Sequence, residues 1–179
     1  MLIHRIAAQL YTAEALQTVE AGLDSGEDVT LAVSQSGRTL MAAAQFARRP
    51  RPTVYVVSGE DAADRAARSL AAYVGLAHVC RFPERKDYSW REQAPDDAVV
   101  AQRCEALGRI VRGDNCIMVA SARALLRCVP PRDSRYWAST TFAVGEETPF
   151  EDVSRRLVGM GYTPAEAADM PGLFHVHGD

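Results

Sequence analysis

The sequence predicts an α/β fold, a parallel sheet with helices on both faces, followed by the start of a small α+β domain. Between residues 29 and 126, short apolar segments alternate with longer segments whose apolar residues recur at helical spacing. The short segments are apolar almost throughout, which is typical of strands buried on both faces of a parallel sheet. After Pro130 and Pro131 the alternation stops, and this change predicts a second domain.

The chain begins with two predicted helices, at residues 2–10 and 12–23. Apolar residues recur at helical spacing in both, and Thr12 stands where it would cap the second helix. Gly26 lies just beyond the expected end of that helix. We therefore expect a helical pair before the first strand.

The middle of the chain contains four predicted strands, each followed by a predicted helix. β-branched and aromatic residues favour the strands, while Gly and Pro residues are expected to end the helices. Asp96 and Asp97 are interpreted as the first turn of the longest helix, where negative charge is favoured. The predicted strands are residues 29–34, 53–57, 78–82 and 116–120, and the predicted helices are residues 38–48, 61–74, 95–111 and 121–126.

The predicted domain boundary separates residues 1–138 from residues 139–179. The second domain is expected to contain a strand at 140–144, a helix at 149–160 and a strand at 173–176. Two strands and one helix bury too little apolar surface to be stable alone. The second domain is therefore expected to depend on further structure.

Composition limits the classes of function. The 179 residues carry a formal net charge of −3 at pH 7, which excludes a global positive field that would attract nucleic acid or anionic lipid. The four cysteines include no C-x-x-C pair, and this favours free thiols in a reducing compartment. Because the sequence has no long uncharged apolar segment, we expect a cytoplasmic protein with no membrane contact.

The segment after the first predicted strand resembles a phosphate-binding loop. Aligned with the template G-x-x-x-x-G-K-S/T, it keeps the second Gly and the hydroxyl but has Ala at the first Gly and Arg at the Lys. The planar guanidinium differs from the compact ammonium of the template. Two interpretations stay open: a structural strand-turn-helix, and a loop that binds a nucleotide or a lone anion. The candidate residues are Ala32, Ser34, Gln35, Ser36, Gly37, Arg38 and Thr39.

Phosphate hydrolysis would also need an acidic residue that holds a metal ion at the end of another strand. After the predicted strand at residues 116–120 stand Ser121 and Ala122, where a phosphate-hydrolysing fold has Asp and Glu. His175 and His177 would face one side of a strand, but two ligands alone make a poor zinc site. We therefore expect no catalytic residue, no metal site and no cofactor in this chain.

Residues 84–91 combine charged and aromatic side chains and follow the third predicted strand. They are expected to lie at the carboxyl ends of the strands, the edge of a parallel sheet where ligands bind. Such a segment either contacts nucleic acid or forms a solvated loop whose aromatic residues pack against the domain. The candidate nucleic-acid contacts are Arg85, Lys86, Trp90 and Arg91.

Several short segments match those of a known protein family in their order and spacing, although no single segment is decisive. They are residues 34–39, 50–57, 82–84 with Tyr88 beyond, 119–126, 144–145, 157–162 and 171–179. Together they resemble the N-terminal part of the bacterial transcription-repair coupling factors, and more distantly the excision-repair protein UvrB. The resemblance covers nearly the whole chain.

The resemblance implies a helicase-like first domain with a degenerate phosphate loop, as is typical of the coupling factors. It implies that the second domain is the start of an inserted, truncated domain that docks the damage-sensing protein UvrA. The parent would be an ATP-driven DNA translocase. Its ATP and Mg²⁺ sites, and the domains that contact RNA polymerase and DNA, would lie outside these residues.

The resemblance also implies a set of partner-binding residues in the second domain. Thr163 and His177 stand where the family commonly has Arg, so two charge-assisted contacts of such an interface are missing here. The candidate partner-binding residues are Tyr162, Thr163, Phe174, His175 and His177.

The leading hypothesis is a non-catalytic interaction and regulatory module of nucleotide excision repair, which docks UvrA and restrains the translocase. The alternative is the nucleotide-binding domain of a UvrB-like ATPase, in which Arg38 replaces the Lys of the phosphate loop.

Overall fold

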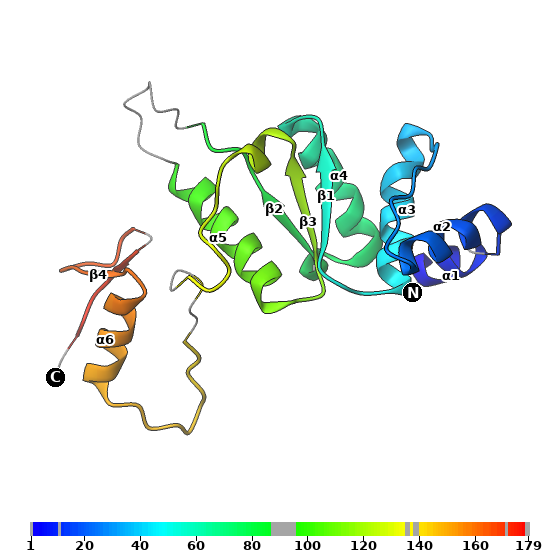
Figure 1. Cartoon of the computed structure of the whole chain (residues 1–179). Helices are drawn as coiled ribbons and strands as arrows, with labels where there is room; N and C mark the ends of the chain where they lie inside the picture. The colour runs from blue at the N-terminus through cyan, green and yellow to red at the C-terminus, as the bar shows by residue number, and fades with distance from the viewer. Residues whose placement is uncertain are drawn as a thin grey trace. The chain divides into compact units, whose positions relative to one another are not determined.

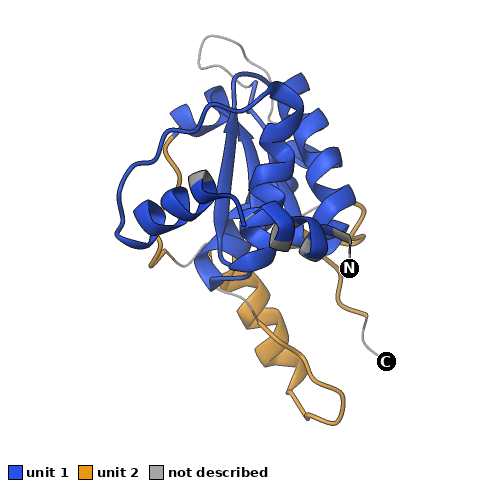
Figure 2. Cartoon of the chain, turned by 90° about the vertical axis from the view of Figure 1, so that its right-hand side faces the viewer, with its two compact units in different colours: residues 1–127 blue, residues 128–179 orange. Residues whose placement is uncertain are grey.

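The computed structural model describes residues 2–10, 12–86, 96–134, 137, 140–170 and 172–177. It divides into two compact units, unit 1 (residues 1–127) and unit 2 (residues 128–179), which are coloured separately in Figure 2. The sequence predicts the domain boundary about ten residues later, after residue 138, and that boundary stays a prediction.

Unit 1 is built on a parallel sheet, as the sequence predicts, but among the described residues the sheet has three strands instead of the four expected (Figure 1). The strands are β1 (Thr53–Val57), β2 (Val79–Phe82) and β3 (Ile117–Ser121), in the order β1-β3-β2. Thr53 of β1 and Val79 of β2 are both aligned with Ile117 of β3. All five residues of the central strand β3 are buried.

Helices cover both faces of this sheet. The chain passes from β1 to β2 through α4 (Glu60–Val74) and returns from β2 to β3 through α5 (Asp97–Arg112). The two connections run across the sheet in opposite directions, and right-handed crossovers then require their helices to lie on opposite faces. The fold class predicted from the alternating pattern is confirmed.

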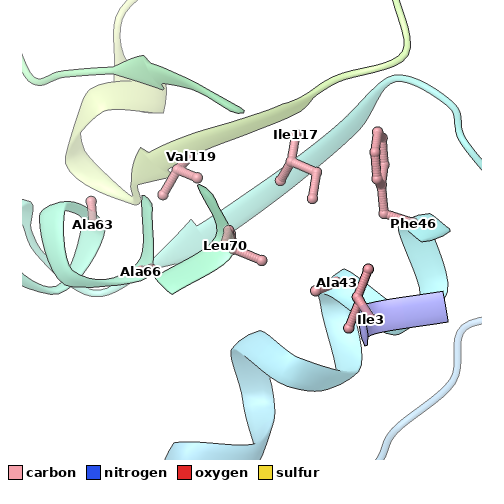
Figure 3. Packing of buried hydrophobic residues seen from close by; sticks show 8 residues of the cluster. All are labelled: Ile3, Ala43, Phe46, Ala63, Ala66, Leu70, Ile117 and Val119. Atoms are coloured by element: carbon pink, nitrogen blue, oxygen red, sulfur yellow. The ribbon is translucent and has the colours of Figure 1, made fainter. Parts of the chain in front are cut away.

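Two apolar cores lie on the two faces of the sheet. On one face, Ile117 and Val119 of β3 pack against α4, α3 (Gln35–Arg48) and α1 (Leu2–Leu10), as Figure 3 shows. On the other face, Met118 and Ala120 pack with Phe82 and with the α5 residue Ala106. The alternation of side chains along β3 therefore divides its residues between the two cores.

The N-terminal helices α1 and α2 (Glu14–Asp24) form as predicted. Arg48 and Arg49, at the end of α3, form ion pairs with Glu20 and Asp24 of α2. The expected cap of α2 is wrong: the Thr12 hydroxyl donates to the Gln9 carbonyl and thus closes the end of α1 instead.

The predicted strand at residues 29–34 is also wrong. These residues are assigned to no strand, and most of them are exposed. A methyl group on Gly22 would come within 2.8 Å of Val29 Cγ2, so this valine packs against the end of α2 rather than within a sheet. A short apolar run does not by itself distinguish a strand from a segment that packs on helices.

Unit 2 contains α6 (Phe150–Gly159) and a two-stranded parallel sheet of β4 (Thr163–Pro164) and β5 (Leu173–Phe174). The helix and the last strand are predicted, although β5 is shorter than expected. The expected strand at 140–144 is wrong, because the structure assigns these residues to no strand. No residue that the structure describes in unit 2 is buried.

Candidate functional site

The candidate phosphate-loop residues lie mostly in a helix rather than in a loop. α3 begins at Gln35, so Gln35, Ser36, Gly37, Arg38 and Thr39 form its first turns, three residues earlier than the sequence predicts. Ser34 is the N-cap residue, but its hydroxyl makes no capping hydrogen bond and instead lies 3.4 Å from the Ser36 hydroxyl. Ala32 precedes the helix and is exposed.

Gly37 is required by a close approach of the chain. A methyl group at this position would lie 2.7 Å from Val33 Cγ1 and 3.3 Å from Ser34 Oγ. Contacts below about 3 Å do not occur between real side-chain carbons, so a larger residue would displace residues 33 and 34. The glycine of the template is therefore explained here by packing.

A groove of about 640 Å³ lies beside these residues in unit 1. We call it the α3–α4 groove, because the start of α3 lines it together with β1 and α4. Arg38 and Thr39 enter it from α3, and Arg65 lies on the α4 wall. Its polar lining residues are Gln35, Ser36, Arg38, Thr39, Tyr55, Ser58, Arg65, Ser69 and Tyr73.

The groove combines positive charge with hydroxyl groups. Arg38 acts electrostatically on the Tyr55 phenol: burial raises the pKa of Tyr55 above its usual 10.0, and the guanidinium opposes that rise. None of the lining residues is acidic. Glu60 and Asp64, at the start of α4, form ion pairs with Arg81 of β2, each at 3.0 Å.

Sequence reasoning missed the α4 side of this groove. Arg65, Ser69 and Tyr73 are separated by four residues each, and this spacing places them on one face of a helix. That spacing is visible in the sequence, but nothing in it indicates that this face lies opposite Arg38. Only the packing of α4 beside α3 brings the two arginines to one groove.

The carboxyl end of β3 has a structural role. The buried Ser121 hydroxyl accepts a hydrogen bond from the Ala124 N–H at 3.2 Å and so begins the short helix η2 (Arg123–Leu126). The residues lining the α3–α4 groove include no Asp or Glu. Ser121, which stands where a phosphate-hydrolysing fold has Asp, thus stabilises the turn that follows β3.

Of the candidate nucleic-acid contacts, only part can be placed. Lys86 is exposed and Arg85 half-buried, both just after β2. Trp90 and Arg91 lie outside the described residues. The basic and aromatic cluster as a whole therefore remains a prediction.

The candidate partner-binding residues come together in unit 2. Thr163 is aligned with Leu173 and Pro164 with Phe174, so Thr163, with Tyr162 directly before it, lies beside the strand that leads to the histidines. His175 Nδ1 lies 2.9 Å from the Ala165 carbonyl oxygen.

The two histidines also contact each other. The Nδ1 atom of His177 is 3.4 Å from Nε2 of His175. Within the described ranges, no group of three or more His, Cys, Asp or Glu side chains is placed to hold a metal ion. The same part of the chain has no helix long and apolar enough to cross a membrane.

Comparison with known proteins identifies relatives for most of the chain, although no protein-family model matches it. The transcription-repair-coupling factor of Myxococcus xanthus is 33% identical over 135 residues, 72% of this chain and 11% of the relative. That of Mycobacterium bovis is 31% identical over 159 residues, 85% of this chain and 13% of the relative. The UvrABC system protein B of Kosmotoga olearia is 22% identical over 181 residues, 93% of this chain and 27% of the relative.

The chain thus spans only 11–13% of the length of these two coupling factors. The UvrB relative matches at lower identity than either coupling factor. The chain belongs to the transcription-repair-coupling factor family, with UvrB proteins as more distant relatives.

Proposed function

We propose that this chain is a non-catalytic interaction module of a transcription-repair-coupling factor, which docks UvrA in nucleotide excision repair. Family membership supports a role in DNA repair. The docking role rests on one observation, the pairing of β4 with β5. This pairing places Thr163, which directly follows Tyr162, beside the strand that carries Phe174 and leads to the two histidines.

The exposed apolar side chains of unit 2 support a docking surface. Among its described residues, Phe150 and Val158 of α6 are 56% and 53% exposed, and Met170 is 57% exposed. Aromatic and methionine side chains are enriched at protein interfaces, where burial against a partner removes their apolar surface from water. A two-stranded sheet with one helix gains the apolar burial that it lacks alone when a partner covers it.

The net charge of unit 2 favours basic groups on the partner surface, except opposite residues 163 and 177, where the arginines common in the family would meet acidic groups. Residues 128–179 contain four Arg and eight Asp or Glu residues, a formal net charge of −4. Complementary charge accelerates encounter and fixes orientation more than it adds affinity. We therefore expect docking to weaken as the salt concentration rises.

The alternative hypothesis, ATP binding with Arg38 in place of Lys, has less support. The residues expected to cradle a triphosphate form the first turns of a helix, so their backbone N–H groups beyond the first turn are used within the helix. The groove beside them has no acidic lining residue to hold Mg²⁺. ATP hydrolysis, DNA translocation and contact with RNA polymerase are proposed to belong to other parts of the parent protein.

Titration of the whole chain with purified UvrA tests the docking role. Phe174→Ala should weaken binding at least about fivefold, because truncating an aromatic anchor of an interface typically costs more than about 1 kcal/mol. Phe142→Ala is the matched control, since Phe142 is exposed in the same unit but lies outside the β4–β5 pair. Equal affinities for the Phe174 variant and the original chain would contradict the assignment of this surface.

The two family arginines provide a gain-of-function test. His177→Arg and Thr163→Arg should each strengthen UvrA binding, because a guanidinium supplies the charge-assisted contact that this chain lacks. His78→Arg, in unit 1, is the control for added charge. Affinity gains of the same size in all three variants would indicate nonspecific attraction instead.

The proposed restraint of the translocase is tested in a full-length coupling factor. Deleting the region that corresponds to this chain should raise the ATPase rate if the module holds the motor in check. An unchanged or lower rate would contradict the regulatory part of the proposal.

A further inference from the structure

The α3–α4 groove contains two arginines that the rest of unit 1 does not neutralise. Arg38 and Arg65 line it from α3 and α4, and neither has a hydrogen bond or an ion pair to any residue that the structure describes. Other arginines of the unit are paired, for example Arg48 with Glu20 and Arg81 with Glu60. The side chains of Arg5, Arg51, Arg68 and Arg123 likewise show no hydrogen bond or ion pair among the described residues of unit 1, but of these six arginines only Arg38 and Arg65 line the groove.

No described carboxylate forms an ion pair with Arg38 or Arg65, although Asp61 lies one turn before Arg65 on α4. Glu60 and Asp64 lie at the start of the same helix as Arg65, but both form ion pairs with Arg81. The lining of the groove instead supplies neutral hydroxyl groups from Ser36, Thr39 and Ser58. Hydroxyls donate hydrogen bonds to an anion without adding negative charge.

The position of Arg38 is supported by its effect on a neighbour. Burial raises the pKa of the Tyr55 phenol, and the positive charge of Arg38 lowers this pKa by a smaller amount. The guanidinium therefore lies within electrostatic reach of Tyr55, which lines the groove. Arg38 and Arg65 are both exposed, so their guanidiniums are accessible to an anion in the groove. A guanidinium fork matches the oxygens of a phosphate group in geometry and charge.

We propose that the α3–α4 groove binds a phosphate-class anion, held by Arg38 and Arg65 from facing helices and by the hydroxyls between them. Binding needs no divalent metal, because the groove has no carboxylate to hold one. The volume of about 640 Å³ accommodates a ligand larger than a single phosphate, so pyrophosphate or a phosphorylated small molecule fits. This site is independent of the β4–β5 surface proposed to dock UvrA.

Calorimetric titration of the whole chain with pyrophosphate in low salt and EDTA tests the site. Arg38→Gln and Arg65→Gln should each weaken binding at least about tenfold, since each removes one charge-assisted contact. Arg68→Gln is the matched control: it removes the same charge from the same helix, but Arg68 does not line the groove. Arg68→Gln should bind pyrophosphate within about twofold of the original chain.

A conservative variant separates local chemistry from loss of folding. Arg65→Lys keeps the positive charge but not the fork, so its affinity should fall between those of the original chain and Arg65→Gln. Far-UV circular dichroism on every variant verifies that the fold is kept. Equal losses in the Arg65 and Arg68 variants would overturn the proposal, as would no detectable heat with the original chain.

Titration with ATP, once in EDTA and once with Mg²⁺, distinguishes a phosphate site from a nucleotide site. The proposal predicts that ATP in EDTA binds, and that Arg38→Gln and Arg65→Gln weaken ATP and pyrophosphate by similar factors. ATP binding that requires Mg²⁺ and is insensitive to Arg65→Gln would overturn it. Failure of this test leaves UvrA docking unaffected, because no residue of the groove belongs to the β4–β5 surface.

Discussion

Arg103 is the buried charge that joins the carboxyl ends of two strands. It is 6% exposed, and its Nη1 donates to the Pro83 carbonyl at 2.7 Å and to the Ala124 carbonyl at 3.3 Å. Its guanidinium carbon lies 3.8 Å from the centre of the Phe82 ring. A helix on one face of the sheet thereby fixes the chain where β2 and β3 end, although the sequence pattern alone presents Arg103 as one more polar helix residue.

Replacing this guanidinium should destabilise unit 1. Arg103→Met keeps much of the volume but leaves two buried carbonyls without their donor and removes the contact with the Phe82 ring. We expect the free energy of unfolding to fall by about 2 kcal/mol. Urea unfolding of the whole chain measures it, with the exposed Arg68→Met as the control, and equal stability of both variants would contradict this role.

The buried thiol of Cys80 makes stability depend on pH in the alkaline range. Burial raises its pKa from 9.0 to about 12, and the neighbouring Cys116 adds to the rise. The folded state therefore keeps a proton that the unfolded state loses above pH 9. Stability from this group is complete below pH 9 and is lost progressively as the pH rises toward 12.

Cys80→Ala should make the decline of stability between pH 9 and 12 shallower, by up to about 1.4 kcal/mol per pH unit. The measurement is urea unfolding at several alkaline pH values. Cys104→Ala, at an exposed cysteine, should leave the slope unchanged. Parallel curves for the original chain and the Cys80 variant would exclude the buried thiol as the cause.

At the scale of elements, α5 is specified at both ends by its own sequence. The Asp96 carboxylate accepts hydrogen bonds from the N–H groups of Ala98 at 2.9 Å and Val99 at 3.4 Å. Gly113 ends the helix in the left-handed conformation, with φ of 77°. The Asp114 N–H returns to the Arg109 carbonyl at 2.9 Å. These local signals explain why sequence reasoning found this helix and its negatively charged first turn.

Alanine substitutions at two glycines in and just after α5 should have opposite effects on the stability of unit 1. Gly113→Ala should destabilise unit 1 by about 1 kcal/mol, because an L side chain is strained at positive φ. Gly108→Ala should be neutral or stabilising by up to about 1 kcal/mol, since Gly108 lies inside the helix and its new methyl group would meet only the flexible end of Arg112. Thermal unfolding compares them, and the reverse order would contradict the assigned helix end.

The segment at residues 29–34 shows where local pattern is insufficient. Its apolar run has the composition of a buried strand, yet Val29 packs against Gly22 and Val33 against Gly37. Strand pairing depends on contacts with residues distant in the sequence, and these are absent from a window of six residues. On β1, Val54 and Val56 point to the same face of the sheet and are 46% and 48% exposed.

At the scale of the whole molecule, the two units differ in how much of their structure the sequence determines. Unit 1 has two apolar cores, and periodicity predicted its helices and three of its strands correctly and one strand, at residues 29–34, wrongly. Unit 2 has no buried residue among those described, so its weaker pattern gave one helix and one strand correctly and one strand wrongly. Elements that obtain little from a core leave a weak pattern in the sequence.

The candidate sites follow the same division. The start of α3 was found from a template whose spacing is local, whereas Arg65 was missed because the pairing of α3 with α4 is a tertiary contact. The grouping of Thr163 with Phe174 was implied by family resemblance, and the alignment of β4 with β5 supplies its geometry. Resemblance and structure therefore contribute different parts of the proposed docking surface.

Equilibrium binding between the whole chain and purified UvrA tests the central claim most directly. The account predicts a complex that weakens with increasing salt, is lost or greatly weakened by Phe174→Ala and is kept by Phe142→Ala. No detectable binding at a chain concentration of about 0.1 mM in low salt, a free energy weaker than about −5.5 kcal/mol, would contradict it.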